Sequence, residues 1–141
     1  MMYRGVHLSI TDFLKNIDEI LKKSSDYTPE ILKFLNEFYG ETPKVYDIIA
    51  SHNQDIVLTQ FIKNQSVIKE TKSKLPLKIK ELIALSAAVA LGCSYCQEVH
   101  MRGALQVGAT KDQVFETILI SSMIAESSKL AVGLRELEKI K

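Results

Sequence analysis

The ten-residue run 82–91 is apolar apart from Ser86, and it strongly limits the folds open to this chain. Pro76 precedes the run and Gly92 follows it, and these residue types favour the start and the end of a helix. The run is too short to span a bilayer. Residues 76–91 are therefore predicted to form a helix without a polar face, and such a helix is buried within a subunit or between subunits.

Signals for helix starts and ends recur along the rest of the chain. Thr28 and Thr42 each precede a proline, a pairing typical of a first helical turn, and no alternating strand pattern competes. The chain is thus expected to form one all-α domain over residues 1–141, with about seven to eight helices. Apolar spacing and capping residues place these helices near 9–21, 29–39, 43–51, 53–68, 76–91, 93–107 and 110–123, with a last one starting at Ser127 or Ser128 and running through Leu137.

Composition and charge narrow the classes of function. Apolar residues make up 46% of the chain and charged residues 25%, which is typical of a soluble globular protein. Eighteen basic and 17 acidic residues nearly cancel, and no basic cluster stands out. We therefore expect no nucleic-acid partner and no membrane partner. The first seven residues contain no long apolar run, which predicts a cytoplasmic protein without a signal peptide.

Both cysteines of the chain lie in one short segment, Cys93-Ser94-Tyr95-Cys96, and His100 follows four residues later. At about 100° per residue, a helix places Cys96 roughly 300° and His100 roughly 340° from Cys93. The three side chains then share one narrow helix face. A nearby base activates a thiol for nucleophilic chemistry, so the spacing predicts a redox-active dithiol.

Gly92 places this pair at the start of a helix, where unpaired backbone N–H groups favour a thiolate. A disulfide across so short a loop stabilises a fold by only about 2 kcal/mol. A purely structural disulfide therefore explains the two-residue gap between the cysteines poorly. A thioredoxin-like fold needs strands that this chain lacks, and c-type haem attachment needs a histidine directly after the second cysteine. Reversible oxidation is the better interpretation.

Glu81 is the second informative residue. It lies past the first helical turn, and its neighbours on the same stripe are Ala84, Leu85 and Ala88. A carboxylate among small apolar side chains is costly without a partner. Because the chain must fold back after Gly92, Glu81 is expected to meet His100 and to hold one imidazole nitrogen, which leaves the other free to take a proton.

Glu81, the Cys93–Cys96 pair and His100 together resemble the carboxymuconolactone decarboxylase/alkylhydroperoxidase D-like (AhpD-like) family. The flanking segments 75–83 and 104–110 agree with this resemblance, which covers residues 43–127 well. It implies an all-α AhpD-like subunit that assembles into a homohexamer or trimer. It also implies a thiol-based peroxidase or disulfide oxidoreductase that acts on a hydroperoxide or disulfide and is reduced by an external dithiol, with no cofactor.

The resemblance also implies a role for each candidate catalytic residue. Cys96 is the thiol that attacks peroxide, and Cys93 is the resolving thiol. His100 is the base, which acts through a water, and Glu81 orients it. Some alkylhydroperoxidases carry a second histidine directly before the second cysteine, where this chain has Tyr95.

Two other classes of function remain open from the residues. A zinc-binding or regulatory module would use Cys93, Cys96 and His100, which are ligand types that suit zinc, with Glu81 as the fourth ligand. Three ligands on one helix face fit a tetrahedron poorly. A non-redox lyase of the decarboxylase type needs only His100 and Glu81, as an acid–base pair. Activity that survives the loss of both cysteines favours the lyase.

Overall fold

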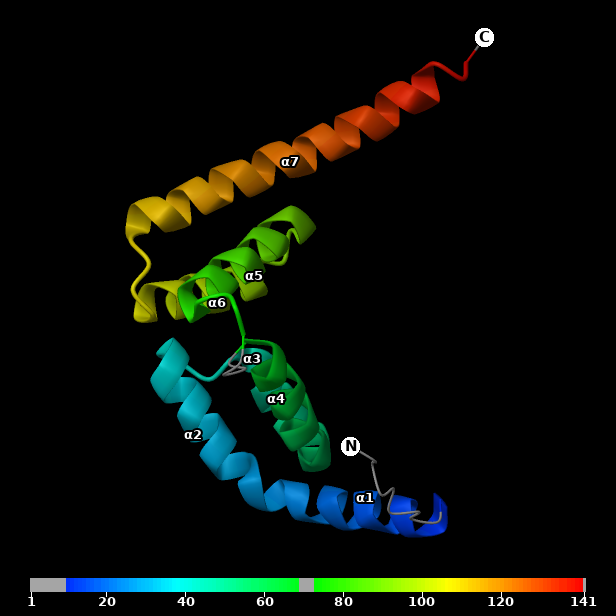
Figure 1. The fold of residues 1–141 in the computed structure, drawn as a ribbon, viewed down its shortest axis with the longest axis vertical. Coiled ribbons are helices and arrows are strands. Elements are labelled where there is room, and N and C mark those ends of the chain that lie inside the picture. The colour runs from blue at the N-terminus through cyan, green and yellow to red at the C-terminus, as the bar shows by residue number, and fades with distance from the viewer. Residues whose placement is uncertain (1–9, 69–72, 141) are drawn as a thin grey trace, which may run out of the picture. The chain divides into compact units, whose positions relative to one another are not determined.

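The computed structural model describes residues 10–68 and 73–140. Over these residues the chain forms seven α-helices and one short 3-10 helix, without strands (Figure 1), which confirms the all-α prediction. The predicted cap Ser9 lies outside the described residues. The helices are α1 (Ile10–Ser24), η1 (Ser25–Tyr27), α2 (Thr28–Tyr39), α3 (Lys44–His52), α4 (Gln54–Ile68), α5 (Leu77–Leu91), α6 (Ser94–Gln106) and α7 (Lys111–Leu137).

The contacts within the chain separate into two compact units. Among the described residues, the first contains 10–37 and 41–65, and the second contains 38–40, 66–68 and 73–140. A single domain over 1–141 stays a prediction. In the first unit, Phe34 and Phe61 meet edge to face with ring centroids 5.7 Å apart, and the buried apolar residues are Ile31, Leu35, Tyr46 and Val57.

The second unit is built on α5, which packs against both α6 and α7. Its core joins Leu85 of α5 to Ala104 of α6 and Val114 of α7. A hydrogen bond also links two of these helices, because the buried Ser121 hydroxyl donates to the carbonyl oxygen of Ser86 at 2.5 Å. These contacts fix the two helices that carry the candidate site.

The exposure of α5 bears on the two predicted environments of this helix, inside a subunit or between subunits. Its apolar surface is not buried all round within this chain, because Ile83 is 53% exposed and Leu91 is 83% exposed. The buried residues of the helix are Glu81, Leu85 and Ala88. Contacts inside this chain therefore bury only part of the apolar surface of α5.

Helix α7 also differs from the sequence prediction. It runs without a break from Lys111 to Leu137, whereas the sequence predicts a new helix starting at Ser127 or Ser128. A serine caps a helix only where the preceding chain leaves helical geometry, and the residues before Ser127 are good helix formers. The prediction of a separate final helix was therefore wrong.

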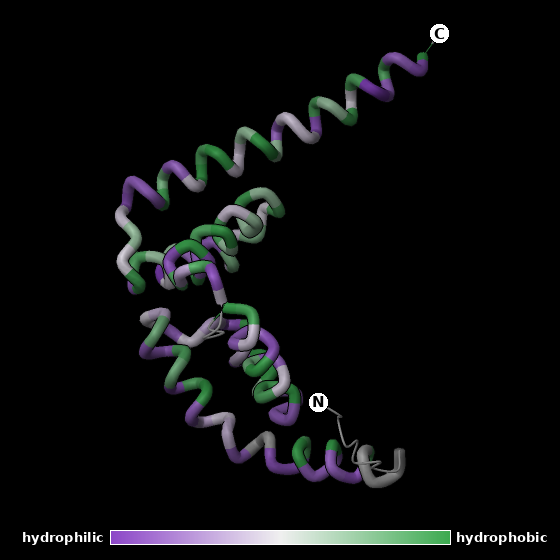
Figure 2. The backbone as a smooth tube through the Cα atoms, in the orientation of Figure 1, coloured by the Kyte–Doolittle hydropathy of each residue, from purple (hydrophilic) through white to green (hydrophobic). Residues whose placement is uncertain are grey.

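Much of α7 lies open to solvent, and apolar residues recur along its whole length (Figure 2). Among the described residues, one helix, α7, is long and apolar enough by length and composition to cross a membrane. Only 6% of its most apolar 18-residue segment is buried. Nothing besides length and composition supports a membrane span.

The start of α7 gives a first testable prediction. Thr110 accepts a hydrogen bond from the Gln113 backbone N–H at 3.1 Å, and the Gln113 side chain accepts one from the Thr110 N–H at 3.1 Å, a full capping box. The Thr110→Ala variant is expected to lose about 1 kcal/mol of unfolding free energy. Urea denaturation measures this loss. The exposed Ser122→Ala change within the same helix serves as control and should cost nothing, and equal losses would contradict the capping role.

Candidate active site

The turn between α5 and α6 sets the position of the cysteines. Gly92 has φ +70°, a left-handed conformation that glycine adopts without strain, and it ends α5. The Cys93 backbone N–H then donates to the carbonyl oxygen of Ala88 at 2.9 Å, which closes the turn. Cys93 is the N-cap residue of α6, so both cysteines lie at a helix start, as the sequence predicts.

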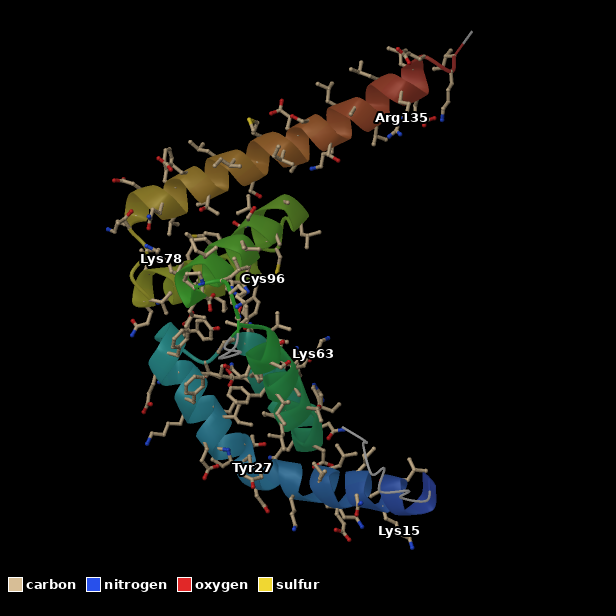
Figure 3. All side chains as sticks on the ribbon, in the orientation of Figure 1. Lys15, Tyr27, Lys63, Lys78, Cys96 and Arg135 are labelled. Atoms are coloured by element: carbon tan, nitrogen blue, oxygen red, sulfur yellow. A yellow bond between two sulfur atoms is a disulfide. The ribbon has the colours of Figure 1, made fainter. Side chains whose placement is uncertain are left out.

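Cys93 and Cys96 are joined as a disulfide, in the first turn of α6 where Figure 3 labels Cys96. The Cys93 sulfur also accepts a hydrogen bond from the Cys96 backbone N–H at 3.2 Å. That N–H is one of the donors that a helix start leaves without a partner in the helix. The same donor is in place to stabilise negative charge on the Cys93 sulfur when the disulfide opens.

Glu81 and His100 form the second part of the site. The His100 Nδ1 atom lies 2.8 Å from Oε2 of Glu81, which joins the middle of α5 to the middle of α6. This is the contact that the sequence predicts. Because a carboxylate only accepts hydrogen bonds, this contact selects the form in which Nδ1 carries a proton. In the neutral ring, Nε2 then holds the lone pair that can accept a proton.

The two partners differ in their access to water. The Glu81 side chain is completely buried, whereas that of His100 is 24% exposed. Within the described residues, no protein group donates a hydrogen bond to the other carboxylate oxygen of Glu81, Oε1. The interaction with His100 is therefore the main compensation for burying this carboxylate, and it orients an imidazole that still reaches the surface.

The described residues contain no candidate metal site. No group of three or more His, Cys, Asp and Glu side chains converges as a set of metal ligands in residues 10–68 and 73–140. Glu81 contacts His100, and both sulfurs are bonded to each other. The zinc alternative therefore lacks a ligand set in this part of the chain.

Two residues beside the site were missed by sequence reasoning. Gly103 is buried in α6, three residues after His100, and the ring of Tyr39 lies next to it. An isolated glycine inside a helical pattern was the available signal, since such a glycine usually has a packing reason. Tyr39 comes from a distant part of the sequence and left no local signal.

Comparisons with known proteins agree with the geometry. A protein from Paracoccus denitrificans described as "Uncharacterized protein 4 in cox locus" is 38% identical over 48 residues, which cover 34% of this chain and 43% of that protein. The chain thus spans less than half the length of this relative. No solved structure matches the chain. The model of the carboxymuconolactone decarboxylase family matches residues 58–139, more than half of the chain, and the chain belongs to that family.

Proposed function

We propose that this protein is a thiol-based peroxidase or disulfide oxidoreductase of the carboxymuconolactone decarboxylase family. The observation that carries the proposal is one helix, α6, which begins with the Cys93–Cys96 disulfide and presents His100 one turn after Cys96. The buried carboxylate of Glu81 holds the imidazole of His100 at 2.8 Å. A dithiol and an oriented base are the two parts that thiol redox catalysis needs.

In the oxidative half of the cycle, His100 takes the proton of the Cys96 thiol through its Nε2 atom. The Cys96 thiolate attacks one oxygen of a hydroperoxide, the O–O bond breaks, and the proton leaves with the alcohol. Cys96 is then a sulfenic acid. The Cys93 sulfur attacks the Cys96 sulfur, water departs, and the disulfide forms.

In the reductive half, an external dithiol reopens the disulfide by exchange. One thiolate of the reductant attacks the Cys96 sulfur and the Cys93 thiolate leaves, where the Cys96 backbone N–H at 3.2 Å stabilises it. The second thiol of the reductant then displaces Cys96 and completes the reductant's own disulfide. Two electrons pass from the dithiol to the peroxide in each cycle.

Steady-state turnover tests the proposed function. We expect the protein to accelerate the consumption of tert-butyl hydroperoxide with dithiothreitol as the dithiol, one peroxide per dithiol oxidised. An assay with a small disulfide in place of the peroxide tests the oxidoreductase branch. If neither substrate is turned over above the rate without protein, the redox proposal fails.

We also propose that copies of this chain associate through α7. Eight large apolar residues on this helix are each more than half exposed, and at helical spacing six of them lie within an arc of about 100°. A stripe of this length on a single helix is typical of a seam between helices. The α7 stripe consists of Phe115, Leu119, Met123, Leu130, Leu134 and Leu137.

A charge within the α7 stripe is therefore expected to break the assembly. The Leu130→Lys variant should run at a smaller mass than the unchanged protein in light scattering with size exclusion. Ser128→Lys adds the same charge to an exposed position on the opposite side of α7 and should leave the mass unchanged. A monomeric mass for the unchanged protein would overturn the proposed association, and so would a protein recovered only with membranes or detergent.

A further inference from the structure

Gly103 of α6 lies directly against the buried carboxylate of Glu81. A Cβ atom added there would lie 2.8 Å from Oε2 of Glu81 and 2.9 Å from its carboxyl carbon. Contacts this short essentially never occur between a Cβ atom and its neighbours. Oε2 is the oxygen that lies 2.8 Å from His100 Nδ1. The space that the missing side chain leaves is thus filled by the atom that orients the imidazole.

Tyr39 closes the same space from another direction. Its Cε1 atom would also lie 2.9 Å from a Cβ atom at position 103. Tyr39 is partly buried and ends α2, and it belongs to the same compact unit as Glu81 and Gly103. A methyl group at Gly103 would therefore meet the carboxylate on one side and the aromatic ring on the other.

Glycine at position 103 lowers the stability of helix α6 when only helix propensity is considered. Glycine is among the least favourable residues inside a helix, and alanine is the most favourable. Gly103 has no positive φ angle that would require glycine, unlike Gly92. A second helical glycine, Gly133 in α7, has no atom within 4 Å of an added Cβ. The reason for glycine at position 103 is therefore the site and not the backbone.

We propose that Gly103 is a positioning residue for the Glu81–His100 pair. Its missing side chain lets the Glu81 carboxylate lie against α6, where Oε2 accepts the Nδ1 proton of His100. The role of Gly103 in catalysis rests on the proposed thiol redox function. Its role in placing the Glu81 carboxylate against His100 is a property of the fold alone. The Gly103→Ala change should displace Oε2, release the imidazole and slow the activation of Cys96.

The imidazole of His100 reports on this displacement directly. In ¹⁵N NMR spectra at a pH where the ring is neutral, the unchanged protein should show His100 mainly as the Nδ1–H tautomer. Gly103→Ala should lose this preference, and Gly133→Ala should keep it. Iodoacetamide should modify Cys96 of the reduced Gly103→Ala protein at least ten-fold more slowly than in the control. An unchanged tautomer in Gly103→Ala would overturn the proposal, whatever the peroxidase activity.

A double-mutant cycle with Glu81→Ala keeps the proposal testable if Gly103→Ala folds poorly. With Glu81 present, Gly103→Ala should lower the melting temperature. With Glu81 replaced by alanine, the carboxylate is absent and the same change should have a smaller effect or raise the melting temperature. Equal shifts in the two backgrounds would show that Gly103 does not act through Glu81 and would overturn the proposal. Failure of the proposed redox function alone would leave both the tautomer and the cycle unaffected.

Discussion

Hydroperoxide turnover by the Cys96→Ser variant is expected to fall to the rate without protein. Serine at this position cannot form a sulfenic acid, so the O–O bond has no sulfur nucleophile placed one helical turn from His100. The measurement is peroxide consumption with dithiothreitol as reductant. Circular dichroism of the variant should match that of the unchanged protein, because a disulfide across so short a loop contributes only about 2 kcal/mol.

The Cys93→Ser variant separates the roles of the two sulfurs. It should consume one equivalent of hydroperoxide and then stop, because no second thiol lies beside Cys96 to form the disulfide. Dimedone should label the trapped sulfenic acid at Cys96. Labelling at Cys93 in the Cys96→Ser variant instead would reverse the assignment. A lyase-type activity that survives both changes would favour the acid–base alternative built on Glu81 and His100.

Replacing Glu81 with glutamine is expected to lower turnover by about 10–100-fold, the effect seen at metal sites when a carboxylate that orients a histidine is lost. The amide keeps the size of the side chain but removes the negative charge that stabilises the imidazolium. The variant should unfold at the same or a higher urea concentration, because a neutral amide costs less to bury than a carboxylate. Steady-state kinetics and urea unfolding measure the two effects on the same sample.

Glu98→Gln is the matched control for this change. Glu98 also lies near the site, on α6, but its side chain is 55% exposed and pairs with Arg102 at 2.9 Å on the surface. An exposed ion pair of this kind contributes little to stability. Its loss should leave turnover and unfolding almost unchanged. If Glu81→Gln behaved like Glu98→Gln in the turnover assay, Glu81 would not orient the base.

The sequence predicts those features of the site that depend on residues close to one another in the chain. Gly92 requires a sharp reversal of the chain, and a mid-helix carboxylate at Glu81 requires a partner, so together they predict the contact with His100. The capping box at Thr110 is equally local, because both of its hydrogen bonds join residues three apart. Such features depend on backbone geometry and near neighbours alone.

Other features depend on contacts that no sequence pattern records. The space between Gly103, Glu81 and Tyr39 arises from packing between distant segments, and a single helical glycine does not show what fills that space. The continuity of α7 through Ser127 was missed because serine is typical of helix caps and is also tolerated inside a helix. The exposed α7 stripe has the same periodicity as a buried core face, so its pattern does not distinguish a core from a surface between subunits.

A single turnover tests the central claim most directly. The fully reduced protein is mixed with one equivalent of tert-butyl hydroperoxide without reductant, quenched in acid, alkylated and mapped by mass spectrometry. We predict that two thiols disappear for each peroxide consumed and that the product is the intramolecular Cys93–Cys96 disulfide. Peroxide that persists while both cysteines remain open to alkylation would contradict the account.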